Sequence, residues 1–240
     1  MGENRPDLSE AVCEFSGVRL DNGGGAPLEF CIRRGELWIV ELPRAGARPD
    51  VAGAASGTSK VLEGAVRVLG CDWATDNLDA AEAARRRTGR VFDARHGPIW
   101  LQNLHIGENL LLPHTITGCE PVAETMRRME AIGKEFGFDE IPKTRPSVTS
   151  HRVSQSAQCV RAFMRRQLDF LILEVPTRQA DALVATVLRR KVAEVLDGGC
   201  GVLWITDRSE ADGNVPRDLA KGAVFYGKSR WTGEEDVDED

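Results

Sequence analysis

The chain has 240 residues, 42% of them hydrophobic and 28% charged, so it can bury the core of one globular domain. The net charge of −6 argues against nucleic-acid binding, because neutralising phosphates needs clustered Lys and Arg. No stretch approaches the roughly 20 apolar residues of a membrane span, and the polar start Met1–Glu10 is unlike a signal peptide. We therefore expect a cytoplasmic protein that reaches a membrane only through a partner.

The cysteines and histidines show no metal-binding pattern. The six cysteines are scattered without a Cys-x-x-Cys pair, and the four histidines have no ligand spacing such as His-x-x-x-His. We therefore expect reduced, mostly buried thiols and no metal site.

The first 92 residues read mostly as strands. Leu37–Leu42 is a nearly continuous apolar run, which is typical of a strand buried on both faces. Asn77–Arg87 is rich in alanine, carries its acids early and ends in three arginines, an order that favours a helix through the helix dipole. In chain order we predict strands over 11–20, 28–33, 37–42, 66–69 and 91–92, a loop over 43–60 and a helix over 77–87.

The rest of the chain alternates helices and strands. Residues 100–145 are predicted to be mostly helical, with the run Leu110–Leu112 stopped by Pro113. The amphipathic stretch Asp181–Leu196 ends before two glycines that form a typical C-cap. We predict helices over 121–136, 153–164 and 181–196, and strands over 168–173, 202–206 and 223–226. This alternation predicts an α/β protein with a mainly parallel core sheet, to which the first strands add an antiparallel sheet.

Several segments have the order and spacing of one family's motifs. They are Gly35–Val40, Glu63–Gly70, Arg87–Phe92, Val160–Met164, Leu171–Thr177 and Gly201–Thr206. Together, over residues 12–228, they resemble the ATP-binding subunit of ABC transporters. The resemblance implies a P-loop NTPase-like ABC ATPase fold with an N-terminal antiparallel β-subdomain and a helical subdomain at about 100–165. It also implies one domain over 1–228, followed by an acidic tail at 229–240 that we expect to be disordered.

The segment Asn103–Pro113 resembles the start of the helical subdomain in subunits that serve lipid and lipoprotein transport, including the Mla/Mce type. In that family the helical subdomain holds an integral-membrane permease, and two ATP-binding subunits pair. The resemblance therefore implies a permease partner and a homodimer or heterodimer. The candidate docking residues are Asn103, Leu104, Glu108, Asn109, Leu112 and Pro113.

The phosphate loop of this family requires G-x-x-x-x-G-K-[ST], in which glycines expose backbone N–H groups, lysine reaches the phosphates and the hydroxyl binds Mg²⁺. Leu42 stands at the first glycine and Ala47 stands before the lysine position, with Gly46 as a vestigial glycine of the loop. Arg48 replaces the lysine, and Pro49 replaces the metal-binding serine and removes an N–H. Asp50 then adds a negative charge. We therefore expect no ordinary site for ATP or Mg²⁺.

The other catalytic positions are also replaced. Walker B needs an Asp for the metal and a Glu for the attacking water, and here the pair is Glu174 and Val175. Of the signature, aligned with Thr149–Val153, only Ser150 survives. Asp93 stands at the Q-loop glutamine (Gln102 fits less well), Asp207 stands at the switch histidine, and Asp181 alone matches, at the D-loop.

These replacements indicate a pseudo-ATPase, a structural or regulatory subunit on the inner face of a membrane that binds no cofactor. One alternative is an atypical ATPase, with Glu174 as metal ligand and Asp207 or Asp93 as base. Only that alternative requires ATP and Mg²⁺. A second alternative is a soluble adaptor with an ABC-like fold that binds proteins through its acidic tail.

Overall fold

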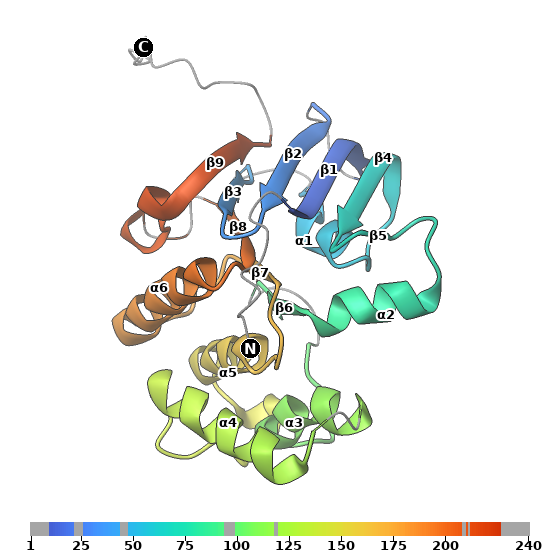
Figure 1. The fold of residues 1–240 in the computed structure, drawn as a ribbon. Helices are drawn as coiled ribbons and strands as arrows, with labels where there is room; N and C mark the ends of the chain where they lie inside the picture. Colours follow the sequence, from blue (N-terminus) through green and yellow to red (C-terminus); the bar gives the residue numbers. More distant parts are fainter. Residues whose placement is uncertain are drawn as a thin grey trace, which may run out of the picture.

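Two β-sheets form the body of the protein (Figure 1). The computed structural model describes residues 10–21, 26–43, 48–93, 99–117, 120–207, 210 and 212–226. The first sheet has the order β2-β1-β4-β5 and is antiparallel. Its strands are β1 (Ala11–Leu20), β2 (Leu28–Arg33), β4 (Val61–Val68) and β5 (Cys71–Asp72).

The second sheet is parallel and has the order β6-β7-β8-β3-β9. Its strands are β6 (Thr88–Val91), β7 (Phe170–Glu174), β8 (Gly201–Thr206), β3 (Leu37–Glu41) and β9 (Ala220–Phe225). The α/β class, the mainly parallel core sheet and the added antiparallel sheet are thus confirmed.

The core lies on both faces of the parallel sheet, which is why its central strands are continuous apolar runs. The buried residues form two large hydrophobic clusters, one on each face of this sheet. In β7, Leu171 and Leu173 belong to the cluster formed with most of the helices, whereas Phe170 and Ile172 belong to the cluster formed with the antiparallel sheet. The period of two residues places alternate side chains in the two halves of the core.

Six α-helices are described: α1 (Val51–Ala55), α2 (Leu78–Arg86), α3 (Ile106–Thr117), α4 (Val122–Glu135), α5 (His151–Phe163) and α6 (Ala182–Asp197). Three short 3-10 helices, Pro146–Val148, Asp212–Asn214 and Arg217–Leu219, complete the described helical segments. Helices α3, α4 and α5 lie together below the sheets in Figure 1. None of the described helices is long and apolar enough to cross a membrane.

Two local predictions were wrong. The expected loop over 43–60 contains the short helix α1, which forms because Asp50 caps its N-terminus and all five of its residues are buried. Pro113 does not stop a helix but lies inside α3. Proline in a helix interior costs about 3 kcal/mol, and burial of Ile106 and Leu110 in the core offsets that cost.

Candidate functional site

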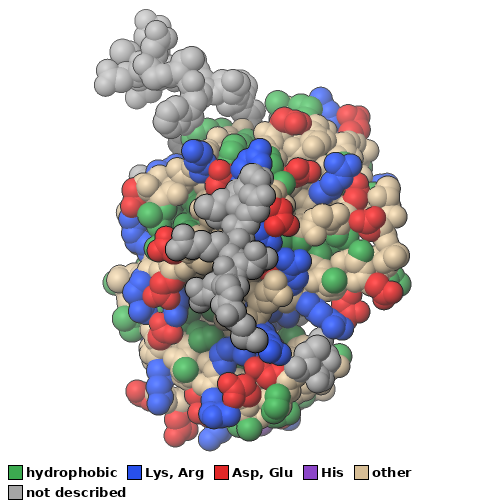
Figure 2. Space-filling model, in the orientation of Figure 1, with side chains coloured by type: hydrophobic (Ala, Val, Ile, Leu, Met, Phe, Trp, Pro, Cys, Tyr) green, Lys and Arg blue, Asp and Glu red, His purple; other side chains and the backbone are tan. Residues whose placement is uncertain are grey.

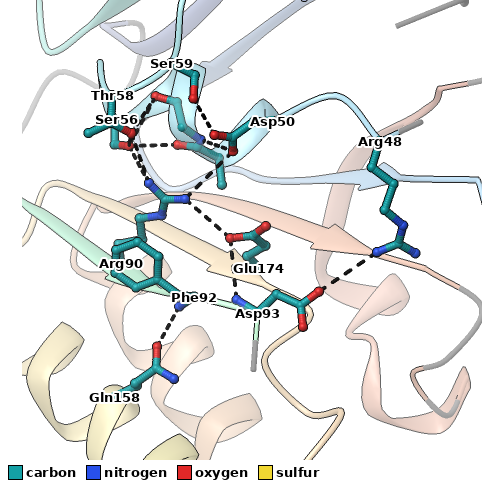
Figure 3. Close-up of polar contacts among 12 residues, drawn as sticks. Arg48, Asp50, Ser56, Thr58, Ser59, Arg90, Phe92, Asp93, Gln158 and Glu174 are labelled. Atoms are coloured by element: carbon teal, nitrogen blue, oxygen red, sulfur yellow. Dashed lines mark hydrogen bonds and ion pairs between the residues drawn. The ribbon is translucent and has the colours of Figure 1, made fainter. Parts of the chain in front are cut away.

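Several candidate site residues meet at the carboxyl ends of neighbouring parallel strands, the edge where open α/β sheets bind ligands. Glu174 is the last residue of β7, while Asp93 and Asp207 come shortly after β6 and β8. Arg48 lies beyond β3. The sequence therefore identified a set of residues that the fold does bring together, and Figure 3 shows several of them.

An arginine that the sequence analysis missed joins the two aspartates. Arg178 Nη1 donates to both oxygens of Asp93, at 2.7 and 2.9 Å, and its Nη2 donates to Asp207 Oδ2 at 2.5 Å. Arg48 Nη2 also pairs with Asp207 Oδ2, and Arg48 Nη1 lies 3.9 Å from Asp93 Oδ2. Two cations thus bridge two buried carboxylates, an arrangement that neutralises all four charges internally. We call these four residues the ion-pair cluster.

Arg90 on β6, a second arginine that the sequence analysis missed, forms an ion pair with Glu174. Its Nη2 lies 3.4 Å from Glu174 Oε2 and 3.9 Å from Asp50 Oδ1, and its Nη1 donates to Ser56 Oγ at 2.7 Å (Figure 3). The backbone N–H of Asp93 lies 3.5 Å from the same Glu174 oxygen. Glu174 is therefore held by a guanidinium and lies close to the ion-pair cluster.

The N-terminus of α1, the helix after the phosphate-loop segment, already carries an anion. Asp50 Oδ1 accepts the backbone N–H of Gly53 at 2.7 Å, and Asp50 Oδ2 accepts a hydrogen bond from Ser59. Gly53 is needed there, because a Cβ would lie 2.0 Å from Asp50 Oδ2. The carboxylate therefore satisfies the N-terminus of this short helix from within the chain.

The remaining phosphate-loop positions offer little to an anion. Leu42 is buried, and its N–H donates to Thr206 O at 2.8 Å. Pro49 is buried and has no N–H. Gly46 lies outside the described residues.

Val175, which the sequence resemblance aligns with a catalytic glutamate, has an unusual backbone conformation. Its φ is +43°, a conformation that strains a β-branched residue, and its side chain is buried. Its N–H donates to Ile205 O at 2.8 Å. An apolar side chain here cannot accept a proton, so no general base stands at this position.

The signature and D-loop positions pair with each other. Ser150 caps α5 by accepting the N–H of Val153 at 3.3 Å. Asp181 caps α6 by accepting the N–H of Val184 at 2.8 Å, and it also pairs with Arg152. The surviving serine and aspartate thus have structural roles within this chain.

The predicted docking segment begins α3. Asn103 and Glu108 are exposed, and Leu104, Leu112 and Pro113 are half-buried. Glu108 Oε2 accepts the N–H of His105 at 2.6 Å, as in a capping box.

Asn109 requires a correction, because it is buried. Its Oδ1 accepts the N–H of Leu101 at 2.8 Å, and its Nδ2 donates to the carbonyls of Leu101, Leu104 and His105. The amide is used entirely to hold the approach to α3, so a partner would not contact it.

The possible metal-ligand and thiol side chains of the described residues are placed as follows. Within the described ranges, no group of three His, Cys, Asp or Glu side chains could hold a metal ion. Of the five described cysteines, four are buried and Cys31 is half-buried. Burial raises the pKa of the Cys159 thiol to about 12, which keeps it protonated and unreactive at neutral pH.

Comparison with known proteins agrees with this geometry at the level of the fold. No family model matches the chain. A solved ATP-binding subunit of an ABC transporter superposes with a TM-score of 0.71 and 20% identity, covering 90% of this chain and 85% of that one. The ATP-binding cassette MJ0796, a dimer in a post-hydrolysis state bound to ADP and Pi, gives a TM-score of 0.69 and 18% identity, covering 90% and 94%. The chain therefore has the fold of ABC-transporter ATP-binding subunits.

Proposed function

We propose that this chain is a catalytically inactive ABC ATPase-like subunit that docks on an integral-membrane permease and supports or regulates a transport complex. In this proposal residues 1–228 act as one domain on the inner face of the membrane. The subunit pairs with a second copy or with another ATP-binding subunit, and lipid is the cargo class suggested by the segment Asn103–Pro113.

The ion-pair cluster is the observation that carries the proposal. Arg48 takes the place of the phosphate-loop lysine, yet its guanidinium pairs with Asp207, and Arg178 binds the same carboxylate and Asp93. A nucleotide phosphate would have to separate these charges and leave Asp93 and Asp207 buried beside it. Unpaired buried charges are costly, so the cluster disfavours phosphate.

The residues present also fit Mg-ATP poorly. The carboxylate of Asp50 caps the helix at which a phosphate would bind, Pro49 offers neither hydroxyl nor N–H, and Val175 offers no base. We therefore derive no catalytic step through a bound nucleotide.

Docking is supported by apolar side chains exposed on the helical part of the molecule. Ile116 on α3 is 75% exposed, and Met126 on α4 is 40% exposed. Leu111 and Met126 also line a pocket of about 510 Å³ between these helices and the segment 138–143. Exposed apolar side chains beside a pocket are typical of a protein-binding surface.

The first test is the melting temperature of the full-length protein in Mg-ATP. Nucleotide at 100 times its dissociation constant stabilises a folded protein by about 2.7 kcal/mol, which is roughly 5 to 10 °C at this size. We expect no shift at millimolar Mg-ATP and no phosphate release. Magnesium-dependent hydrolysis that Glu174→Gln abolishes would overturn the proposal in favour of the atypical ATPase.

The second test concerns the partner. Tagged full-length protein, cross-linked in cells and purified in detergent, is expected to retain a protein with several membrane-spanning helices. Ile116→Asp and Met126→Asp should reduce its recovery, whereas Leu62→Asp, 52% exposed on β4 of the antiparallel sheet, should not. Capture of water-soluble proteins alone would support the adaptor alternative instead.

A further inference from the structure

A pocket of about 290 Å³ lies between the end of α2, strand β6 and helix α5, apart from the ion-pair cluster. Four arginines line it: Arg85 in the last turn of α2, Arg90 on β6, Arg161 in the last turn of α5, and Arg165 just after α5. Figure 2 shows Lys and Arg side chains near the C-terminal end of α2. Such a concentration of cations is unexpected in a chain with a net charge of −6.

The deeper arginines of this pocket have neutral partners. Arg161 Nη1 donates to Ile99 O at 3.3 Å, and Arg165 Nε donates to Thr88 O at 3.1 Å. Among the residues that the structure describes, no carboxylate forms an ion pair with Arg161 or Arg165. Arg161 Nη2 and Arg90 Nε are buried and make no hydrogen bond in the described structure.

Burial makes these unpaired cations costly. Desolvation, together with the charges of Arg165 and Arg90, lowers the pKa of Arg161 to about 10, and burial also lowers the pKa of Arg165. Buried charges are normally paired, and buried donors normally find an acceptor. The pocket is therefore short of negative charge.

Aromatic rings hold the guanidinium groups in place and shape the wall. Arg85 lies over Trp73 at 5.0 Å from the ring centroid, and Arg90 lies over Phe92 at 4.1 Å. Arg161 also lies over Trp100, at 4.4 Å from the ring centroid, and over Phe92, at 5.6 Å, so these ring contacts fix the guanidinium groups that line the pocket.

We propose that this pocket binds a compact oxyanion, a phosphate or carboxylate group. The anion pairs with Arg161 and Arg165. Because Arg90 also contacts Glu174 at 3.4 Å, an occupant competes with Glu174 for this guanidinium. Pro113, one of the candidate docking residues, also lines this pocket.

Two sources could present this chemistry: a small molecule, or the acidic run Glu234–Asp240 of the same chain. A purely structural role offers another account of the arginines, because cations at the C-terminal ends of α2 and α5 favour the helix dipoles. That role predicts no response to added anions, so a binding experiment separates it from the proposal.

The experiment follows the melting temperature of full-length protein with phenyl phosphate at constant ionic strength. At about ten times the dissociation constant we expect a rise of roughly 3 to 6 °C, and none with phenol, which lacks the anion. Arg161→Met and Arg165→Met should each weaken binding about tenfold or more, because each removes a charge-assisted hydrogen bond. Arg127→Met, on the exposed surface of α4, is the matched control and should bind as the parent does.

Two further variants test whether a folding defect explains weaker binding and which molecule supplies the anion. Arg85→Met changes only an exposed residue at the rim and should also weaken binding. A full-length variant whose six tail acids become Asn and Gln tests the tail: tighter phenyl phosphate binding in this variant would identify the tail as the occupant. Equal binding with and without the tail acids would identify an external small molecule. No shift in either protein, or an unchanged shift in Arg161→Met, Arg165→Met and Arg85→Met, would overturn the proposal.

Discussion

Arg48 and Asp207 form an ion pair that joins the carboxyl ends of β3 and β8. In the family that the sequence resembles, these positions hold a lysine that reaches phosphate and a histidine. In this chain the two positions carry opposite charges and contact each other, because the adjacent parallel strands bring them together. The four residues of the ion-pair cluster thus pair with one another.

Arg178 pairs with both aspartates, so its removal tests how much the ion-pair cluster contributes to stability. Arg178→Met should destabilise the protein by about 3–5 kcal/mol, because Asp93 and Asp207 remain buried with fewer partners. Urea unfolding measures the change. Arg189→Met is the control: Arg189 pairs with Asp218 at the surface, so its loss should cost at most about 1 kcal/mol. Equal effects in the two variants would show that the cluster is not buried as described.

Two substitutions of Asp50, which caps α1, distinguish the contribution of its charge from that of its hydrogen bond. Asp50→Ala should cost about 0.5–2 kcal/mol, because the N–H of Gly53 loses its acceptor. Asp50→Asn keeps an acceptor oxygen and should cost less, losing mainly the attraction to Arg90 at 3.9 Å. Thermal unfolding of both variants checks this order. A larger loss in Asp50→Asn would mean that charge, rather than the cap, holds this segment.

Asn109 and Asn103 differ in role although both belong to the predicted docking segment. Asn109→Ala should destabilise the protein by about 2–3 kcal/mol, because it removes several partly buried hydrogen bonds to the backbone of Leu101, Leu104 and His105. Asn103→Ala, at an exposed position, should leave stability within about 0.5 kcal/mol. Chemical denaturation of the two variants provides the measurement. A stable Asn109→Ala protein would contradict the assigned structural role.

Sequence reasoning succeeded where the information is local or comes from a whole motif. The apolar runs of β3, β7 and β8 were recognisable because a strand covered on both faces has no polar positions. Residues Arg48, Asp93, Glu174 and Asp207 were grouped through the family resemblance, and the fold does place them at one edge.

The missed features depend on contacts between residues that are distant in sequence. Arg178 and Asp93 are 85 residues apart, and no spacing rule connects them. Arg90 looked like an ordinary strand residue, and its link to Glu174 exists only because β6 pairs with β7. Pro113 was taken as a helix end because local propensity argues so, but burial of Leu110 outweighs that propensity.

Asp169, just before β7, should contribute to the decrease in the free energy of unfolding at acidic pH. Arg34 Nη1 and Arg87 Nε donate to its two oxygens, each at 2.8 Å. Burial by itself raises the pKa of this carboxyl, but the two arginines outweigh burial and hold the pKa below its ordinary value of 3.8. The folded pKa thus lies below the unfolded one, so ionised Asp169 stabilises the protein above the unfolded pKa. This contribution is lost as pH falls through the folded pKa.

Asp169→Asn should therefore lower the unfolding free energy at pH 7, by about 1–3 kcal/mol, because Arg34 stays buried with a weaker acceptor. Below about pH 3.8 the difference between parent and variant should shrink, because the carboxyl is protonated first in the unfolded chain and then, as pH falls through the lower folded pKa, in the folded protein as well. Urea unfolding at a series of pH values from 7 to 2 measures both parts of this prediction. A difference that stays constant over the series would mean that the two arginines do not stabilise the ionised form. In that case the ion pairs at the base of β7 would contribute through packing alone.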